Sequence, residues 1–310
     1  MNDPMPQFIA DFKEVSSILL EYGWFISPYM TGGEFEKIHD FCSKIRDSTS
    51  KGNVDKKAIT ENINLIMTDI IFQPSYRAFF VFRSKELPYI KEYSYFLERS
   101  ILHYYKRDFL SCVLCLLPAI EGILLSYYGW SIGDERKPTY SQLIKKIEES
   151  KKMTELPERY DMYRSTLVEF LRKWIFIDTH GADFDISYLN RHYILHGMGK
   201  KCFYSANDCH RLILFFDLLI EYLSLEEKKY YIFIPDDPLG INIRREYYLT
   251  LIENDPNNKT MIKLEEEFMK ENRNYETEKE PPKWADIQFR YMLETLEFYE
   301  KLERMRNQQK

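Results

Sequence analysis

One arginine and two histidines lie close together in the stretch from Leu189 to Gly197. The guanidinium of Arg191 offers a planar set of donors that fits phosphate oxygens and stays charged. His192 and His196 can take or give a proton near neutral pH. These groups suit metal-free cleavage of a phosphodiester. A base removes a proton from a ribose 2′-hydroxyl, the oxygen attacks the phosphorus, and the cation stabilises the transition state.

The spacing within this stretch leaves two interpretations open. On an ideal helix Arg191 and His196 point about 140° apart, whereas His192 and His196 share a face at i and i+4. Either Arg191 and His196 form an active or phosphate-binding pair, or Arg191 makes a surface ion pair and both histidines are ordinary helix residues. A distorted helix end would bring the pair together. Asn190 is either a helix cap or a substrate contact.

The surroundings of the stretch are basic although the chain is acidic. The whole chain carries 43 Lys and Arg against 49 Asp and Glu, a net charge of −6. Residues 188–211 carry four basic residues against one aspartate, a net of +3. We expect Lys200, Lys201 and Arg211 to contact RNA from this local patch, since a uniformly basic nucleic-acid binder is excluded. A second basic run either guides RNA or forms a solvated helix face: Arg136, Lys137, Lys145, Lys146, Lys151 and Lys152.

Other catalytic or metal-binding patterns do not occur in the sequence. It has no glycine-rich phosphate loop and no G-x-S-x-G turn, and residue 193 is tyrosine where HExxH needs glutamate. Cys112 and Cys115 have zinc-ligand spacing but no second pair. We therefore predict neither a metal nor a cofactor. Five cysteines, an odd number, indicate reduced thiols and a cytoplasmic protein.

The elements that must position these groups are helical nearly throughout. Apolar residues make up 45% of the chain, so a hydrophobic core can form. The apolar spacing predicts helices, with residues 76–82 as helix or strand, a strand at 228–235 and a turn at Pro238-Leu239-Gly240. The predicted helices are 8–24, 34–45, 59–72, 92–105, 109–128, 141–152, 158–177, 186–196, 207–223, 244–271 and 284–306. Asp55 opens the helix at 59–72, and Asn207 or Asp208 caps the strong helix that runs to residue 223.

The run 109–128 is apolar and long enough to cross a membrane, but it contains a proline and a glutamate. We interpret it as a buried core helix, and predict no membrane contact. Its glutamate, Glu121, needs a partner because a lone buried carboxylate is costly. The partner is either an orienting contact to Arg191 or His192, or a purely structural salt bridge.

The motif, an arginine followed by a polar residue, several intervening residues and a histidine, resembles the signature of the HEPN superfamily. Here Arg191 is followed by His192 in the polar position and then by His196. The flanking Asn190 and Gly197 are similar to those of HEPN proteins in phage-defence loci, as is Glu121-Gly122. The resemblance covers about residues 89–224. It implies a bundle of about four core helices: roughly 90–105, 108–128, 158–177 and 207–223.

The resemblance also implies a function, because many HEPN proteins are ribonucleases of bacterial defence and toxin systems. On this basis we expect a metal-independent endoribonuclease in which Arg191, His196 and His192 are catalytic. Asn190 and Glu121 support them. The alternative is a non-catalytic HEPN-like module that binds a protein partner or a nucleotide. Met198 stands where some of these toxins carry a tyrosine that a nucleotidyltransferase modifies, so an antitoxin of that kind is not supported.

HEPN enzymes usually build the site from two copies, so the resemblance implies a homodimer. We expect an N-terminal helical region (1–88), the HEPN-like bundle (89–224) and a C-terminal helical appendage (225–310). The helix 207–223 is apolar around much of its circumference and must be covered on more than one side. We expect it to face a second copy, with the C-terminal appendage as the alternative cover.

Overall fold

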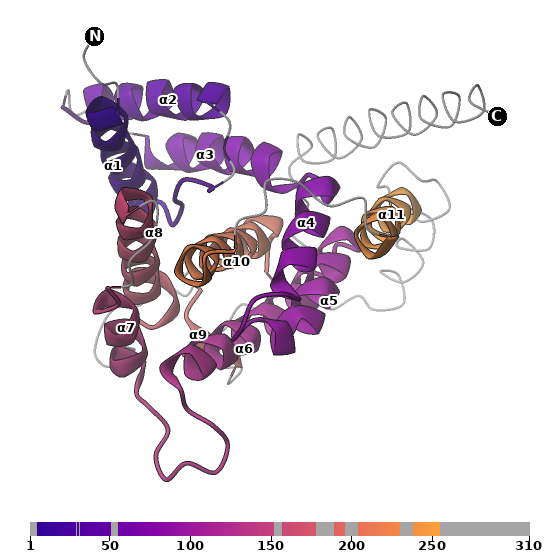
Figure 1. The fold of residues 1–310 in the computed structure, drawn as a ribbon. Coiled ribbons are helices and arrows are strands. Elements are labelled where there is room, and N and C mark those ends of the chain that lie inside the picture. The colour runs from indigo at the N-terminus through magenta and orange to yellow at the C-terminus, as the bar shows by residue number, and fades with distance from the viewer. Residues whose placement is uncertain are drawn as a thin grey trace.

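The computed structural model describes residues 5–28, 30, 32–50, 55–151, 157–177, 189–195, 204–229 and 238–254 (Figure 1). Every regular element in these ranges is a helix, which confirms the predicted all-α fold. The α-helices are α1 (Met5–Glu21), α2 (Gly32–Ser50), α3 (Lys56–Ile71), α4 (Pro74–Ser84), α5 (Ser94–Tyr105), α6 (Phe109–Tyr128), α7 (Tyr140–Glu148), α8 (Pro157–Phe170), α9 (Arg191–Leu195), α10 (Ala206–Glu227) and α11 (Pro238–Glu253). A short 3₁₀ helix, η1 (Lys91–Tyr93), precedes α5, and a π-helical turn, η2 (Leu171–Ile175), extends α8.

Several helix ends follow the signals read from the sequence. Asp55 opens α3 because its carboxylate accepts hydrogen bonds from the backbone N–H groups of Lys57 and Ala58. Gly129 ends α6 in the left-handed conformation, with φ of 95°, which glycine adopts without a steric penalty. The helix predicted at 109–128 is thus confirmed at both ends.

The starts of α9, α10 and α11 differ from the prediction. α9 begins at Arg191, and residues 189 and 190 of the helix predicted at 186–196 are not helical. α10 begins after Ser205 rather than at Asn207 or Asp208, because Ser205 and Asp208 form a capping box in which the Asp208 carboxylate accepts the Ser205 N–H at 2.9 Å. The turn expected at Pro238-Leu239-Gly240 is instead the first turn of α11. Proline fits there because the first residues of a helix have no intrahelical acceptor for their N–H groups.

Residues 76–82, which the sequence left as helix or strand, belong to α4. This helix is buried on nearly all sides, so its aromatic residues show no polar face from which a period could be read. Residues 230–235 of the strand predicted at 228–235 lie outside the described residues, as do the predicted helix at 284–306 and residues 255–271 of the helix predicted at 244–271.

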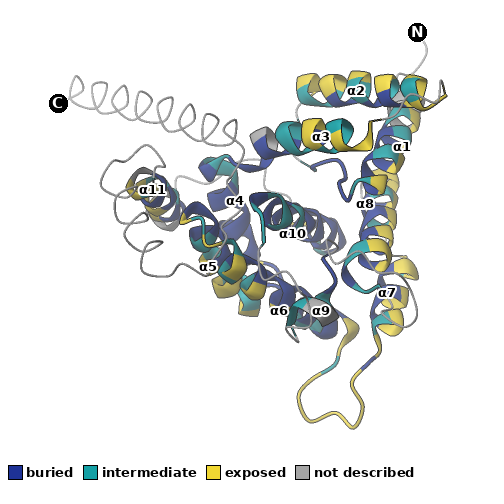
Figure 2. Cartoon of the chain, turned by 180° about the vertical axis from the view of Figure 1, so that it is seen from behind, coloured by how far each residue is buried: buried dark blue, intermediate teal, exposed yellow. Residues whose placement is uncertain are grey.

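α10 lies at the centre of the molecule (Figure 1). It packs against α3, α4, α6 and α8, and its side chains are buried along almost its whole length (Figure 2). The apolar circumference of this helix is therefore covered by the chain's own helices. The prediction that it faces a second copy is wrong, and a dimer of this protein must use another face.

One hydrophobic core extends from Phe12 in α1 to Leu251 in α11. Both α3 and α4 contact α10, and α11 packs against α4 and α5. The boundaries expected at residues 88 and 224 therefore do not separate hydrophobic cores. The helices before residue 88 and the first helix after residue 224 belong to the same packed body as the bundle between them.

Among the described helices, only α6 is long and apolar enough to cross a membrane. It packs against α5, α7, α9 and α10 inside the molecule, and most of its side chains are buried, with Leu110 and Leu114 among the exceptions. The core helix of a soluble protein passes the same test of length and composition. The packing of α6 is compatible with a soluble protein.

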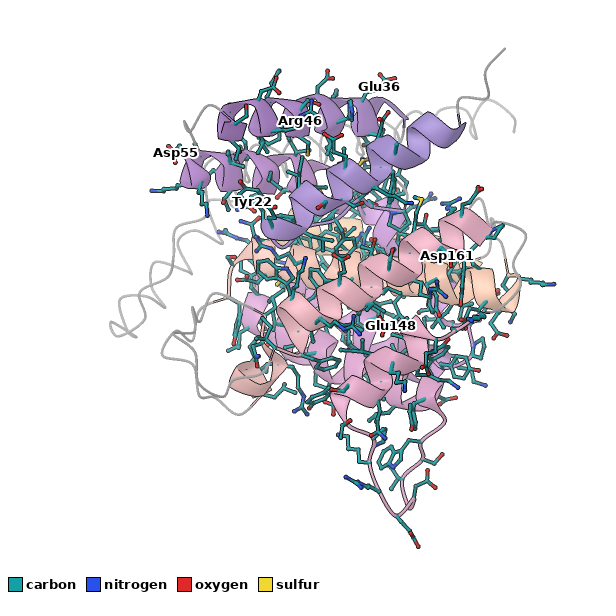
Figure 3. The ribbon with its side chains drawn as sticks, turned by 90° about the vertical axis from the view of Figure 1, so that its left-hand side faces the viewer. Tyr22, Glu36, Arg46, Asp55, Glu148 and Asp161 are labelled. Carbon is teal, nitrogen blue, oxygen red and sulfur yellow. The ribbon has the colours of Figure 1, made fainter. Side chains whose placement is uncertain are left out.

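The fold contains a buried ion pair in its core as well as exposed charges on its outer helices. Arg77 of α4 makes a two-pronged ion pair with Asp217 of α10, with N–O distances of 2.8 and 2.7 Å, and both side chains are buried. Burial raises the pKa of Asp217 to about 6, while Arg77 opposes this shift. The charges of α2, such as Glu36 and Arg46, lie instead on the outer side of the molecule (Figure 3).

Candidate functional site

Glu121 lies in the second half of α6, where the neighbouring residues Ala119, Ile120 and Ile123 are buried apolar side chains. Its own side chain is only 7% exposed. The helix therefore carries a carboxylate into the edge of the core, which requires compensation by opposite charge or by hydrogen bonds.

Two cations compensate the Glu121 carboxylate, one on each oxygen. Arg191 Nη2 lies 2.6 Å from Oε2, and Lys137 Nζ lies 2.5 Å from Oε1. The two cations come from different segments: Arg191 is the first residue of α9, and Lys137 belongs to the loop between α6 and α7. The Arg191 contact was one of the two predicted for Glu121, and the structure contains it.

Tyr140, the first residue of α7, supports the Arg191 guanidinium from a second direction. The guanidinium carbon lies 5.6 Å from the centre of the Tyr140 ring, within the range of a cation–π interaction. The ring is stacked in turn on Phe176, with centroids 4.2 Å apart. Burial raises the pKa of Tyr140, as does the nearby Glu121, while Arg191 and Lys137 act in the opposite direction.

Asn190 ties the start of α9 to the end of the α8 segment. Its side-chain N–H donates to the carbonyl oxygen of Ile177 at 2.8 Å, and its backbone carbonyl accepts the Ile194 N–H at 3.1 Å. The residue is 1% exposed. Asn190 therefore directly precedes α9, as the cap interpretation expects, and its side-chain hydrogen bond links this position to the preceding segment. The bond anchors the stretch that carries Arg191.

Four of the predicted site residues lie wholly or partly outside the described residues. His196, Lys200 and Lys201 are outside, and of His192 only the backbone, in α9, is described. The relation between Arg191 and the histidines therefore stays a prediction.

Arg211, expected to contact RNA, lies instead among residues of the N-terminal helices. Its guanidinium lies 4.6 Å from the centre of the Trp24 ring and 3.5 Å from an Asp208 carboxylate oxygen, and it donates to the Tyr22 carbonyl at 3.4 Å. Burial lowers its pKa, while Asp208 opposes the shift. These contacts explain Arg211 as a structural link between α10 and the segment after α1.

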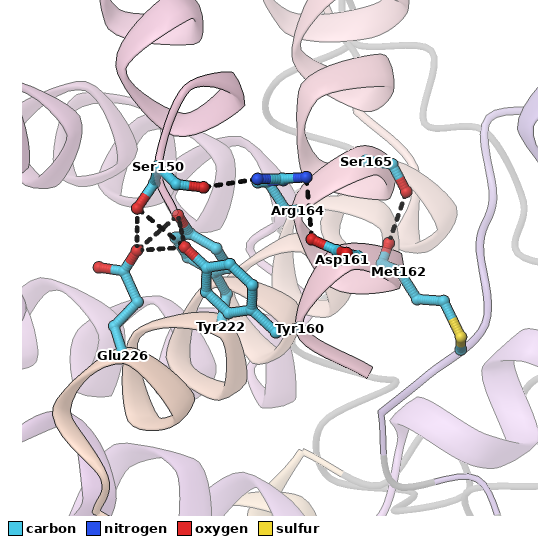
Figure 4. A network of polar contacts seen from close by, with 8 residues as sticks. All are labelled: Ser150, Tyr160, Asp161, Met162, Arg164, Ser165, Tyr222 and Glu226. Carbon is cyan, nitrogen blue, oxygen red and sulfur yellow. Dashed lines mark hydrogen bonds and ion pairs between the residues drawn. The ribbon is translucent and has the colours of Figure 1, made fainter. Parts of the chain in front are cut away.

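A second polar cluster, which the sequence analysis did not single out, surrounds Glu226 at the end of α10 (Figure 4). Four hydroxyl groups donate to its Oε1 atom at 2.6–2.8 Å. Burial raises the pKa of Glu226, but these hydrogen bonds outweigh it and hold the pKa below its ordinary value. The donors are Tyr127, Ser150, Tyr160 and Tyr222. Because they come from α6, α8, α10 and the segment after α7, the cluster joins four parts of the chain.

Comparison of the chain with protein-family models, with curated proteins and with solved structures gives no match. In the part of the chain that the structure describes, no three His, Cys, Asp or Glu side chains are grouped so as to hold a metal ion. The features that bear on function are the geometry around Glu121 and Arg191 and the motif in the sequence.

The residues that sequence reasoning missed at this site are Tyr140 and Phe176. Lys137 was noted only as a member of a basic run. The signal for their positions is partial: Thr139 and Gln142 form a capping box that starts α7, and this fixes Tyr140 as its first residue. The spacing does not predict which helix the start of α7 packs against.

Proposed function

We propose that this protein is a metal-independent endoribonuclease that cleaves RNA by attack of a ribose 2′-hydroxyl, acting in bacterial anti-phage defence or as a toxin. The support in the sequence is the resemblance of the Arg191–His196 stretch to the HEPN signature. The observation that carries the proposal is the fixed position of Arg191, which Glu121 holds by an ion pair and Tyr140 by its ring.

In this proposal Arg191 stabilises the charge that builds up on the phosphate oxygens. A cation that is already oriented needs no rearrangement during the reaction, and such preorganised groups are usually the largest single contribution to catalysis. Glu121 and Asn190 position Arg191 and do not take part in proton transfer. Lys200 and Lys201, which follow the motif, bind the RNA backbone.

His196 is the proposed acid–base group, and His192 is proposed as a further catalytic residue. A base removes the proton from the 2′-hydroxyl, and the oxygen forms a bond to the adjacent phosphorus. The bond from phosphorus to the 5′-oxygen breaks, and an acid returns a proton to that oxygen. The products are a 2′,3′-cyclic phosphate and a 5′-hydroxyl. We further propose a homodimer that brings two copies of the motif together, with α10 excluded from its interface.

A second candidate function is a non-catalytic module that binds a protein partner or a nucleotide. The observation in its favour is that the Arg191 side chain is only 17% exposed and already pairs with a carboxylate. An arginine in this setting also suits a purely structural ion pair. The two candidates differ in whether a purified, folded protein turns over RNA.

RNA cleavage by the full chain tests the proposal. We expect cleavage in EDTA that leaves 2′,3′-cyclic phosphate ends, and a loss of about 10²–10⁴-fold in His196→Ala with the fold retained. Cleavage that stops in EDTA and leaves 5′-phosphate ends would require a metal-activated water, and the roles of Arg191 and His196 would be withdrawn. No cleavage of any RNA by folded protein, together with binding of a nucleotide, would favour the second candidate.

A further inference from the structure

Lys137 reaches the candidate site from outside the two segments that carry the motif. It belongs to the long loop between α6 and α7, which projects from the body of the molecule (Figure 1). Its ammonium group contacts Glu121, yet its side chain is 49% exposed, compared with 17% for Arg191. Glu121, Arg191 and Lys137 form a cluster of charged groups, which we call the Glu121 cluster. Lys137 is its most exposed member.

The cluster carries more positive than negative charge. Lys137 and Arg191 contribute two positive charges and Glu121 one negative charge, and among the described residues neither cation contacts a second carboxylate. The Nε atom of Arg191 is buried and makes no hydrogen bond within the described residues. The formal net charge of the cluster is thus +1, which favours the approach of an anion such as a phosphate group.

The ammonium group of Lys137 has three N–H donors, so donors remain besides the one that points to Glu121. Those on the exposed side of Lys137 can meet a ligand, because the side chain is half exposed. Lys137 is the more exposed of the two cations, so solvent screens its contact with Glu121 more than it screens the deeper contact of Arg191.

We propose that Lys137 is a second phosphate-binding residue of this site and contacts the RNA backbone next to the phosphate held by Arg191. Glu121 then has two tasks, since each of its oxygens holds one of the two cations. This inference rests on the proposed ribonuclease function. It adds to it a contact from the α6–α7 loop, which lies outside the motif.

The test is the salt dependence of RNA binding. The probe is a short single-stranded RNA with 2′-O-methyl sugars at every position, which cannot undergo 2′-hydroxyl attack. Each phosphate contact with a single strand contributes about 0.7 to the slope of log K against log salt concentration. We expect Lys137→Gln to reduce this slope by about 0.7 and to weaken binding equally for probes of different base sequence. Lys137→Arg, which keeps the charge, should retain the slope.

Lys44→Gln is the matched control, because Lys44 is an exposed lysine of α2. This helix lies at the opposite end of the molecule from the α6–α7 loop (Figure 1). Thermal unfolding of each variant shows that the fold is intact. A wild-type protein that cleaves RNA, with Lys137→Gln and wild type showing equal slopes, would overturn this inference and leave the ribonuclease proposal standing. A wild-type protein that neither binds nor cleaves RNA would overturn both.

Discussion

Glu121 of α6 and Arg191 of α9 form an ion pair in which Oε2 and Nη2 lie 2.6 Å apart. Both side chains are largely enclosed, so water and salt screen their interaction less than that of a surface pair. The pair therefore fixes the direction of the arginine that begins the motif. In the proposed reaction Glu121 is a positioning residue, and its effect on catalysis passes through Arg191.

Replacing Glu121 by glutamine tests this role. We expect Glu121→Gln to lower kcat for RNA cleavage by up to about 10²-fold, because a displacement of about 1 Å can cost that much. KM should change less, since the charge of Arg191 remains available to bind RNA. Glu121→Asp, which keeps the carboxylate, should recover part of kcat. Steady-state kinetics separate these effects, with Glu148→Gln on the outside of α7 as the control; an unchanged kcat in folded Glu121→Gln would contradict the positioning role.

The planar shape of Arg191 should matter as much as its charge. We expect Arg191→Lys to reduce cleavage nearly as strongly as Arg191→Ala, because lysine loses the fork of donors and the flat face that lies against Tyr140. Initial rates of the three proteins, compared at equal folded fraction, provide the measurement. If the lysine variant cleaved RNA at the wild-type rate, charge alone would explain the contribution of Arg191.

His210 should make the fold sensitive to acid. It is fully buried in α10, where its ring contacts Tyr104 and, at 3.2 Å, Thr68. Burial lowers its pKa to about 3, with Arg211 and Arg77 adding to the shift. Below about pH 6.5 the unfolded chain takes up a proton that the folded protein excludes, so stability is complete above that pH and falls as the pH drops towards 3.

The expected loss through His210 is about 2 kcal/mol between pH 7 and pH 5. Urea unfolding of wild type and of His210→Gln at these two pH values measures it. The variant should lose less stability than wild type over this interval, even if it is less stable at pH 7. Equal pH dependence in wild type and His210→Gln would remove His210 as its cause.

Breaking the buried ion pair between Arg77 and Asp217 should lower the stability of the fold strongly, whereas replacing both residues with apolar ones should lower it little. We expect Arg77→Met alone to destabilise the fold by about 3–5 kcal/mol, because it leaves Asp217 without its partner in the core. The double variant Arg77→Met with Asp217→Leu should recover most of this loss. Arg46→Met, which breaks an exposed pair with Glu14, should cost less than about 1 kcal/mol. Denaturant unfolding of the four proteins compares them; a double variant as unstable as Arg77→Met would argue against the explanation.

Local signals predicted the helices well where a polar residue and a glycine or proline enclose an apolar run. The helix over 109–128 lies between Asp108 and Gly129, and its ends follow from these two residues. α4 was undecided because a helix that is buried on nearly all sides shows no polar face. For α10 the sequence predicts that much of the circumference must be covered, but the choice between the chain's own helices and a second copy depends on long-range packing.

The candidate site was predictable only in part for a similar reason. A carboxylate inside an apolar helix requires a partner, and this led from Glu121 to Arg191. Lys137 and Tyr140 reach the same place because the loop after α6 returns along the bundle, and no spacing in the sequence encodes that path. The three-dimensional arrangement of Arg191 and His196 stays a prediction, because His196 lies outside the described residues.

The central position of α10 has a consequence for biosynthesis. The helices that enclose it, α3, α4, α6 and α8, are all translated before it. Their inward apolar faces have no central helix to pack against until the ribosome has added residues 206–227. A nascent chain is therefore exposed to aggregation over most of its synthesis, as is typical of proteins in which distant segments must meet. Chains that terminate before α10 should require chaperones or be degraded. Once α10 has been synthesised, the surrounding helices can pack against it and bury their apolar faces.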